Sequence, residues 1–112
     1  MQAGHRKLRL IRSEMHIMKM ITAVVRPFKL DELRQAIALS GVQGMTVTEV
    51  HETSFGPRTK VEVAVDDDIV EPVVEAIANV SRTGRDGDGR IWVGDIEQAI
   101  RIRTRETGTA AT

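Results

Sequence analysis

The sequence predicts a single α+β domain in which one antiparallel sheet carries two helices on the same face. Three observations support this prediction. Segments rich in β-branched residues alternate with amphipathic helical segments, in the order strand, helix, strand, and this order occurs twice. The two middle strands are joined by a short polar connection, which is typical of an antiparallel hairpin. The chain has 112 residues, 41% of them hydrophobic, which suffices for one core but not for two.

The first strand and helix are predicted between residues 18 and 40. The run MKMITAVVRPF favours a strand up to Arg26, and Pro27 ends it because proline has no backbone N–H to donate. Leucine and isoleucine at helical spacing then predict a helix over residues 29–40, with acidic residues in its first turn and Gly41 as its C-cap.

The central hairpin is predicted from two alternating segments. MTVTEV (residues 45–50) and KVEVAV (residues 60–65) both alternate in the way that strands do. The connection HETSFGPRT (residues 51–59) is short and polar and contains a Gly-Pro break, so the two strands most simply pair antiparallel.

The second unit follows an acidic run. The aspartates of residues 66–68 are expected to cap a helix over residues 68–81, whose valines and isoleucines share one face. The glycine-rich stretch RTGRDGDGR (residues 82–90) comes next, followed by the strand RIWVGDI. A last short strand, AIRIRT (residues 99–104), would place Arg101 and Arg103 on one face.

Two such units joined by a hairpin describe a ferredoxin-like fold. The sheet face away from the helices would carry alternate residues of four strands, several of them apolar, and such a face must be buried against something. Closed homo-oligomers are the usual solution for a small domain. These patterns predict self-association but do not fix the number of subunits.

Composition excludes several classes of protein. Sixteen basic and sixteen acidic residues cancel, so no overall field favours nucleic acid. The absence of cysteine excludes disulfides and thiolate metal sites, and it suits the cytoplasm. No apolar run approaches the roughly 20 residues of a membrane span, so no direct membrane insertion is expected. Residues 1–17 lack a secretion signal and are expected to be a disordered extension before a domain at residues 18–112.

The glycine-rich stretch (residues 82–90) suits anion binding. Successive backbone amides in such a turn can form a nest, and neighbouring guanidinium groups add bidentate hydrogen bonds to phosphate. The alternative is a plain helix-to-strand turn, with Gly84 as C-cap and solvated arginines. Arg101 and Arg103 favour the anion, because side-by-side arginines repel unless an anion lies between them. With Arg90, three guanidiniums would converge on a polyphosphate, although the stretch is not a P-loop.

From Met18 to Thr107 the chain resembles the PII signal-transduction proteins, the nitrogen regulatory PII family. The segments that carry this resemblance are MITAVVRPFKLDELRQAI, GVQGMTVTEV, TGRDGDGRIWV and IRIRTRETG. The resemblance implies a homotrimer that binds adenine nucleotides (ADP, ATP or AMP) in the clefts between subunits. It assigns the phosphates and their surroundings to Thr83, Gly87, Asp88, Gly89, Arg90, Arg101 and Arg103, with Arg90 where the family usually has lysine. It assigns the adenine and ribose to Gly44, Met45, Thr46, Glu62 and Ala64.

The chain departs from the family pattern between its second and third strands. The family's long T-loop is reduced to HETSFGPRTK, and without any tyrosine the chain cannot be uridylylated on tyrosine. The family's glutamine after Phe55-Gly56 is absent, and Arg58 replaces a lysine that contacts 2-oxoglutarate. Sensing of 2-oxoglutarate is therefore not expected.

A shortened T-loop is similar to the PII-like branch linked to inorganic carbon uptake. Arg58, with Gly56, is the candidate site for a small anion such as bicarbonate, because a guanidinium can bind it bidentately. The alternative is a solvated hairpin arginine. No metal site is expected, since His51 and Glu52 are too few ligands.

The expected function is a nucleotide-dependent regulator of a protein partner, a transporter or an enzyme, in bicarbonate metabolism. It is not expected to be an enzyme itself. The first alternative is a nitrogen-regulatory PII protein that controls ammonium uptake or glutamine synthetase in response to ATP, ADP and 2-oxoglutarate. A slow nucleotide-hydrolysing enzyme and a copper-tolerance-type trimer of the same fold are further alternatives.

Overall fold

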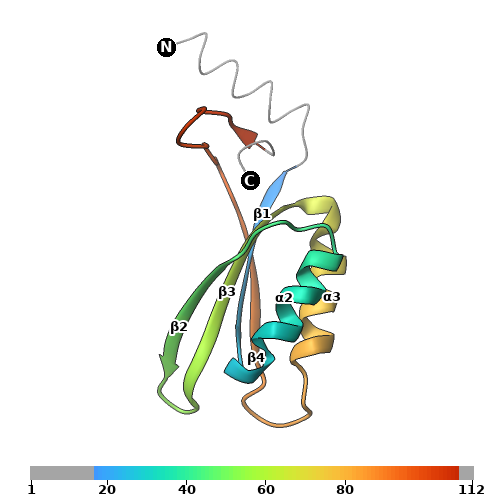
Figure 1. Ribbon diagram of the computed structural model, residues 1–112, viewed down its shortest axis with the longest axis vertical. Helices are drawn as coiled ribbons and strands as arrows, with labels where there is room; N and C mark the ends of the chain where they lie inside the picture. Colours follow the sequence, from blue (N-terminus) through green and yellow to red (C-terminus); the bar gives the residue numbers. More distant parts are fainter. Residues whose placement is uncertain (1–16, 109–112) are drawn as a thin grey trace.

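The computed structural model describes residues 17–108, and its strands form one antiparallel sheet with the order β2-β3-β1-β4. Both helices cover the same face of this sheet, so the predicted ferredoxin-like fold is confirmed (Figure 1). The elements are β1 (Met18–Val25), the 3₁₀ turn η1 (Pro27–Lys29), α2 (Leu30–Leu39), β2 (Thr46–Glu52), β3 (Gly56–Asp66), the 3₁₀ turn η2 (Asp67–Ile69), α3 (Val70–Ser81) and β4 (Gly89–Asp95).

Except for Ile17, the predicted N-terminal extension lies outside the described residues, as do residues 109–112 of the predicted domain. Within residues 17–108, no helix is long and apolar enough to cross a membrane.

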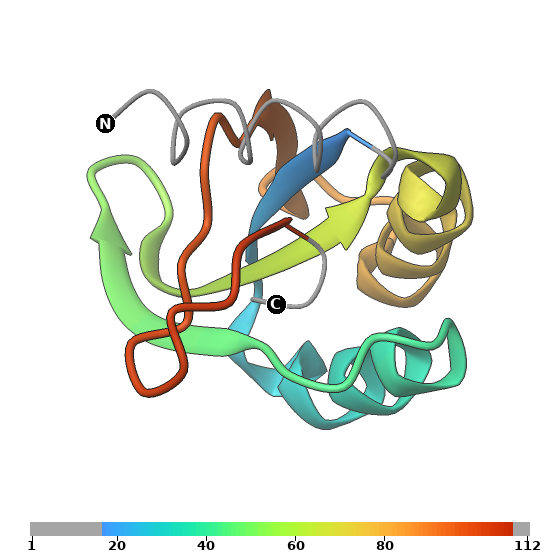
Figure 2. The ribbon, with the colours of Figure 1, turned by 90° about the horizontal axis from the view of Figure 1, so that it is seen from above.

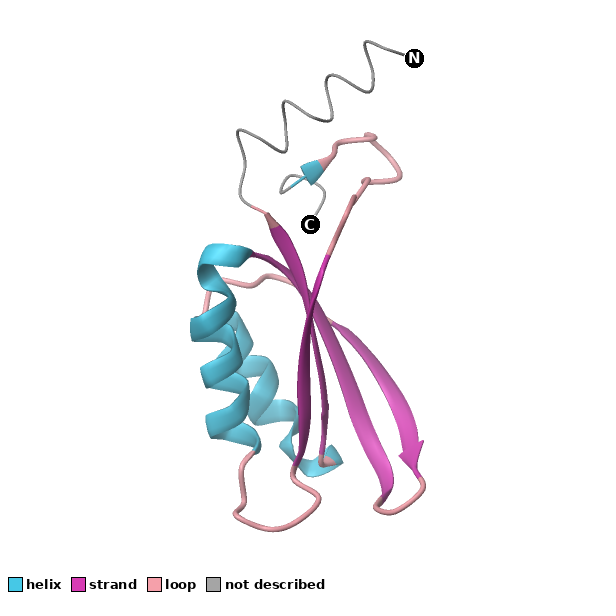
Figure 3. Cartoon of the chain, turned by 180° about the vertical axis from the view of Figure 1, so that it is seen from behind, coloured by secondary structure: helices cyan, strands magenta, loops and turns pink. Residues whose placement is uncertain are grey.

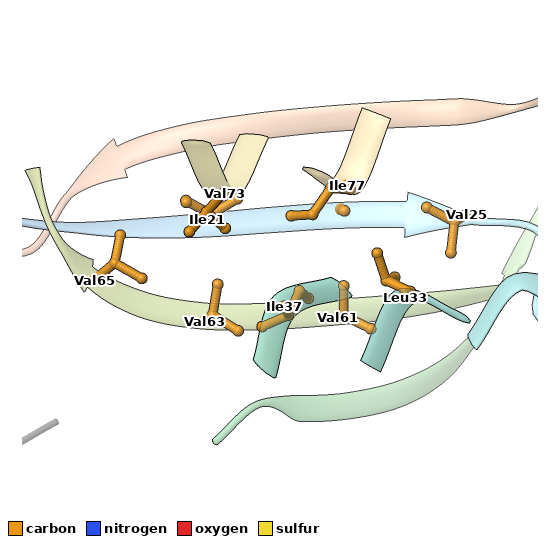
Figure 4. Packing of buried hydrophobic residues seen from close by; sticks show 10 residues of the cluster. Ile21, Val25, Leu33, Ile37, Val61, Val63, Val65, Val73 and Ile77 are labelled. Carbon is orange, nitrogen blue, oxygen red and sulfur yellow. The ribbon is translucent and has the colours of Figure 1, made fainter. Parts of the chain in front are cut away.

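The core lies between the two helices and one face of the sheet (Figure 4). Alternate residues of β1 and β3 point to this face because side chains alternate along a strand, and the helices add residues at helical spacing. Leu33 of α2 and Val73 and Ile77 of α3 are completely buried. The other core residues are Ile21, Ala23, Val25, Ile37, Val61, Val63 and Val65. This packing fixes the helices on one face and leaves the opposite face to other contacts.

The start of the second helix differs from the prediction. The acidic run forms the 3₁₀ turn η2, and α3 begins only at Val70, with Ile69 in the N-cap position. Asp66 precedes η2, but its side chain makes no capping hydrogen bond. The predicted acidic cap of the helix was therefore wrong, because a 3₁₀ turn separates the aspartates from the helix N-terminus.

The hairpin strands are longer than predicted. The strands pair as far as Glu52 with Gly56, so most of the expected connection is strand, and only Thr53–Phe55 form the turn. Pro57 is tolerated in β3 because the pairing of β3 with β1 ends at Thr59. At Pro57 the strand has one neighbour, and a residue without an N–H fits such an edge.

The predicted strand over residues 99–104 was wrong. Ile100 makes only an isolated bridge with Thr107, and the residues between them turn back on themselves. The amide of Arg101 donates to the carbonyl of Glu106 at 2.8 Å, and the amide of Arg105 donates to the carbonyl of Arg101 at 2.7 Å. The segment meets its hydrogen-bonding needs locally and adds no strand to the sheet.

The helices leave the second face of the sheet uncovered (Figure 3). The strand register aligns Thr22 of β1 with Glu62 of β3 on one side and with Trp92 of β4 on the other. Trp92 is 49% exposed, so it is not part of the core of this chain. The face mixes apolar and charged side chains, in agreement with the sequence prediction.

Candidate functional site

The glycine-rich loop, defined here as residues 82–88 between α3 and β4, is organised around the carboxylate of Asp88. This carboxylate accepts hydrogen bonds from the backbone amides of Thr83 at 2.7 Å and Gly84 at 2.9 Å, and from the Thr83 hydroxyl. These bonds, led by the Thr83 hydroxyl, hold the pKa of Asp88 well below its usual range. Two backbone amides of the loop are therefore already engaged by an anion from the chain itself, and a nest for an external anion stays a prediction.

Gly84 does not cap the helix. The C-cap of α3 is Arg82, and Gly84 instead donates its amide to Asp88. The plain-turn alternative was therefore wrong about this glycine.

Arg26 holds the loop from the end of β1. Its Nε donates to Asp88 Oδ1 at 3.0 Å, and its Nη2 donates to the carbonyl of Asp86 at 2.8 Å. Arg26 is not among the site residues predicted from the sequence. The strand register contains the signal, because Val25 pairs with Gly89 and the next residue on each side is therefore Arg26 and Asp88.

Arg58 holds the loop from the hairpin. Only 7% of Arg58 is exposed, and its guanidinium donates to the carbonyls of Phe55 at 3.0 Å, Pro57 at 2.7 Å and Gly87 at 3.2 Å. It also lies 5.5 Å from the centre of the Phe55 ring. The terminal nitrogens expected to bind a small anion next to Gly56 are thus committed to backbone carbonyls.

Gly87 and Gly89 are required by the packing of the loop. Both have positive φ, and a Cβ on Gly89 would lie 1.9 Å from the carbonyl oxygen of Val24. A Cβ on Gly87 would lie 2.7 Å from the Phe55 ring. Each glycine therefore has a structural reason that does not depend on a bound phosphate.

The five residues predicted to surround adenine and ribose line one open groove of about 530 Å³. They are Gly44, Met45, Thr46, Glu62 and Ala64, and the groove is completed by Met20, Val63, Ile96, Gln98 and Ala99. Segments that are distant in sequence meet here because β3 pairs with both β1 and β2. The structure thus brings together the whole predicted adenine set.

The groove and the glycine-rich loop lie at opposite ends of the sheet (Figure 1). Gly89 pairs with Val25 and Ala64 pairs with Met20. The two pairs are five positions apart along β1, with four residues between them, which is roughly 16 Å along a strand.

The predicted convergence of Arg90, Arg101 and Arg103 does not occur within one chain. Arg90 pairs with Val24 near the loop, whereas the C-terminal segment lies at the groove end. Figure 2 shows this segment (red) on the side of the sheet away from the helices. The expected convergence assumed a terminal strand beside the others, and that strand does not form. Arg101 instead makes an ion pair with Glu106 at 3.4 Å.

Metal ligands are not clustered in the part of the chain that the structure describes. No three histidine, aspartate or glutamate side chains within residues 17–108 come together in an arrangement that would hold a metal ion.

Comparison with solved structures finds the same fold in a crystal structure of Arabidopsis thaliana PII bound to citrate. That chain is 34% identical, the TM-score is 0.79, and the match covers 87% of this chain and 94% of the Arabidopsis chain. A match that extends over most of both chains at this identity supports common descent as well as a common fold.

Sequence comparison gives the same relationship. The family described as nitrogen regulatory protein P-II matches residues 18–106. Nitrogen regulatory protein P-II of Cereibacter sphaeroides is 46% identical over 111 residues, and P-II 1 of Escherichia coli K12 is 42% identical over 111 residues. Each match covers 99% of the relative and 84% of this chain. Because 84% of 112 residues is fewer than the 111 positions of the alignment, this chain lacks residues that the relatives have. The chain belongs to the nitrogen regulatory protein P-II family, a family of signal-transduction proteins, and is shorter than these relatives within the matched region.

Proposed function

We propose that this protein is a cytoplasmic regulator that binds an adenine nucleotide between copies of the chain and controls a partner protein through that occupancy. The observation that carries this proposal is the joint lining of one groove by Gly44, Met45, Thr46, Glu62 and Ala64. The resemblance assigns all five to adenine and ribose. The named relatives are regulators, which supports a signalling role over catalysis.

The phosphates belong at the glycine-rich loop. The backbone amides of Gly87, Asp88 and Gly89 supply neutral donors, and Arg90 at the start of β4 supplies a guanidinium for charge-assisted hydrogen bonds. The side chain of Asp88 shapes the loop, so in this proposal only its backbone faces the ligand. The nucleotide is ADP, ATP or AMP.

A second copy is needed to complete the site. The groove of one chain and its own loop are separated by several residues of β1, so a compact nucleotide is best held by the groove of one chain and the loop of the next. The uncovered sheet face carries the partly exposed Met20 and the exposed Trp92, which supply apolar surface for such an assembly. We propose a homotrimer, in which Arg101 and Arg103 of one subunit reach the phosphates at another.

Regulation of nitrogen metabolism is better supported for this protein than regulation of bicarbonate metabolism. The relatives named above are nitrogen regulatory proteins, and none of their names refers to bicarbonate. Arg58 would have to give up its bonds to carbonyls before it could hold bicarbonate. The partner, a transporter or an enzyme, must also recognise a three-residue turn where the family has a long T-loop.

Isothermal titration calorimetry of the purified protein tests the proposal. ADP, ATP and AMP are titrated separately, and then again with bicarbonate, 2-oxoglutarate or citrate, since the Arabidopsis relative was crystallised with citrate. We expect at least one adenine nucleotide to bind with a dissociation constant in the micromolar range. A dissociation constant of about 1 μM corresponds to a binding free energy of about −8 kcal/mol. GTP serves as the matched control and should bind more weakly. Failure of every adenine nucleotide at millimolar concentration would overturn the proposal.

A further inference from the structure

Two arginines outside the predicted phosphate set hold the glycine-rich loop in place. Arg26 donates to the carbonyl of Asp86, and Arg58 donates to the carbonyl of Gly87. They reach consecutive peptide groups from different strands, because Arg26 follows β1 and Arg58 belongs to β3. The middle of the loop is therefore fixed at two adjacent points by side chains distant in sequence.

This arrangement determines where the loop amides point. No peptide bond in the described chain is cis, and in a trans peptide the C=O and the following N–H point in opposite directions. When the carbonyls of Asp86 and Gly87 face the arginines, the amides of Gly87 and Asp88 face away from them. Asp86 and Gly87 form a turn, and within residues 17–108 neither amide makes a well-aligned hydrogen bond to another backbone group. Two adjacent donors are thus held outward, ready for an anion.

Arg58 also ties the loop to the hairpin turn. The same guanidinium that reaches Gly87 donates to the carbonyls of Phe55 and Pro57, on the C-terminal side of the turn. The Phe55 ring lies so close to Gly87 that a Cβ there would lie 2.7 Å from it. Arg58 is buried, and its Nε has no hydrogen-bond partner. A buried donor without a partner is costly, so the position favours a specific role over a solvated arginine.

We infer that Arg26 and Arg58 are positioning residues that fix the glycine-rich loop for phosphate. The role toward phosphate rests on the proposed nucleotide binding. Each arginine acts through a backbone carbonyl, whose peptide group orients an amide toward the ligand.

Amide hydrogen exchange of the nucleotide-free protein tests the positioning role directly. We expect the amides of Thr83 and Gly84, which donate to Asp88, to exchange at least about tenfold faster in Arg58→Ala and in Arg26→Ala than in the wild type, with core amides of β1 and β3 unchanged. Arg34→Ala, which removes an exposed arginine from α2, is the matched control and should leave the loop unchanged. Exchange at the wild-type rate in both loop variants would overturn the inference.

Conservative variants separate geometry from charge. A lysine has one ammonium group and cannot reach three carbonyls, so Arg58→Lys should retain less than half of the protection of the loop while keeping the charge. This variant also carries the test if Arg58→Ala fails to fold, as judged by circular dichroism. Full protection in Arg58→Lys would mean that charge alone accounts for the contact, which contradicts the inference.

The link to phosphate is tested by comparing ADP with adenosine. We expect Arg58→Lys to bind ADP at least about tenfold more weakly than the wild type and to bind adenosine unchanged, because only ADP contacts the loop. If the wild type binds no adenine nucleotide, the proposed function fails while the exchange experiment still judges the positioning role. If the wild type binds ADP and Arg58→Lys binds it equally well, the inference that Arg58 positions the loop for phosphate fails and the proposed function stands.

Discussion

The two ends of the sheet differ in how far a single chain completes them. At the loop end, the carboxylate of Asp88 and the guanidiniums of Arg26 and Arg58 are all engaged within the chain. At the groove end, the groove is open and Ile102 is 95% exposed. The charged groups of the loop end thus have partners within one chain, whereas the groove end exposes surface that a second molecule can contact. The loop end is therefore the rigid half of the proposed site, and the groove end is the half that depends on a neighbour.

Two carboxylates at opposite ends of β4 repeat this contrast. Asp88 precedes the strand and accepts hydrogen bonds from a hydroxyl, two amides and a guanidinium. Asp95 ends the strand and pairs with the ammonium group of Lys19. The Lys19 hydrogen bond lowers the pKa of Asp95, as the Thr83 hydrogen bond lowers that of Asp88. Asp88 organises a loop, whereas Asp95 only joins two neighbouring strands.

The largest expected effect comes from adding a methyl group at each end. Gly89→Ala places a Cβ against the carbonyl of Val24 at positive φ, so we expect a loss of about 3 kcal/mol or more in the free energy of unfolding. Gly44→Ala meets no atom within 4 Å and should change it by less than about 0.5 kcal/mol. Urea denaturation measures both. Equal stability of the two variants would remove the contrast between the ends.

Arg103 tests the same contrast at the groove end of the sheet. It is exposed and lies in the C-terminal turn, so Arg103→Ala should leave the melting temperature unchanged. In the assembly it should weaken ADP binding about tenfold, which is about 1.4 kcal/mol. Calorimetry compares it with Arg34→Ala, which removes the same charge from the outside of α2 and should bind ADP normally. Normal ADP binding by Arg103→Ala would exclude the C-terminal segment from the site.

The stability of the loop end should depend on pH. The pKa of Asp88 is lowered in the folded state, so its contribution to stability is fully present above its unfolded pKa of about 3.9 and is lost as pH falls toward the folded pKa. At pH 7 the wild type should therefore melt above Asp88→Asn, and the difference should shrink below about pH 4. Thermal melts from pH 7 to pH 2 measure this. A difference that grows on acidification would contradict the assigned sign.

The smallest effect is expected at Asp95. The pair with Lys19 is exposed, and such pairs contribute little because solvent and salt screen them. Asp95→Asn should lower the melting temperature by less than about 2 °C. A larger shift than that of Asp88→Asn, measured in the same buffer, would reverse the ranking of the two carboxylates.

Much of this architecture can be predicted from sequence because it depends on local periodicity. β-Branched residues predicted β1, alternation predicted β2 and β3, and helical spacing predicted α2 and α3. Alternation and helical spacing both record which side chains face the core. The positions of Arg26 and Arg58 depend on strand register, which single-strand patterns do not contain. Residues 99–104 alternate like a strand but find their hydrogen bonds in a local turn. Alternation describes the faces of a segment and does not supply a partner for it.

The central claim is that the groove of one chain meets the glycine-rich loop of another, and a mixing experiment tests it most directly. Ala64→Trp fills the groove, and Arg90→Ala removes a guanidinium beside the loop. Each variant alone should bind ADP at least about tenfold more weakly than the wild type. The subunits of the two variants are then exchanged, and mixed assemblies are verified by native mass spectrometry. In a mixed assembly, the intact groove of an Arg90→Ala subunit can meet the intact loop of an Ala64→Trp subunit. We predict that wild-type affinity returns at one site in each mixed assembly, whereas mixed assemblies with no recovered site would contradict the account.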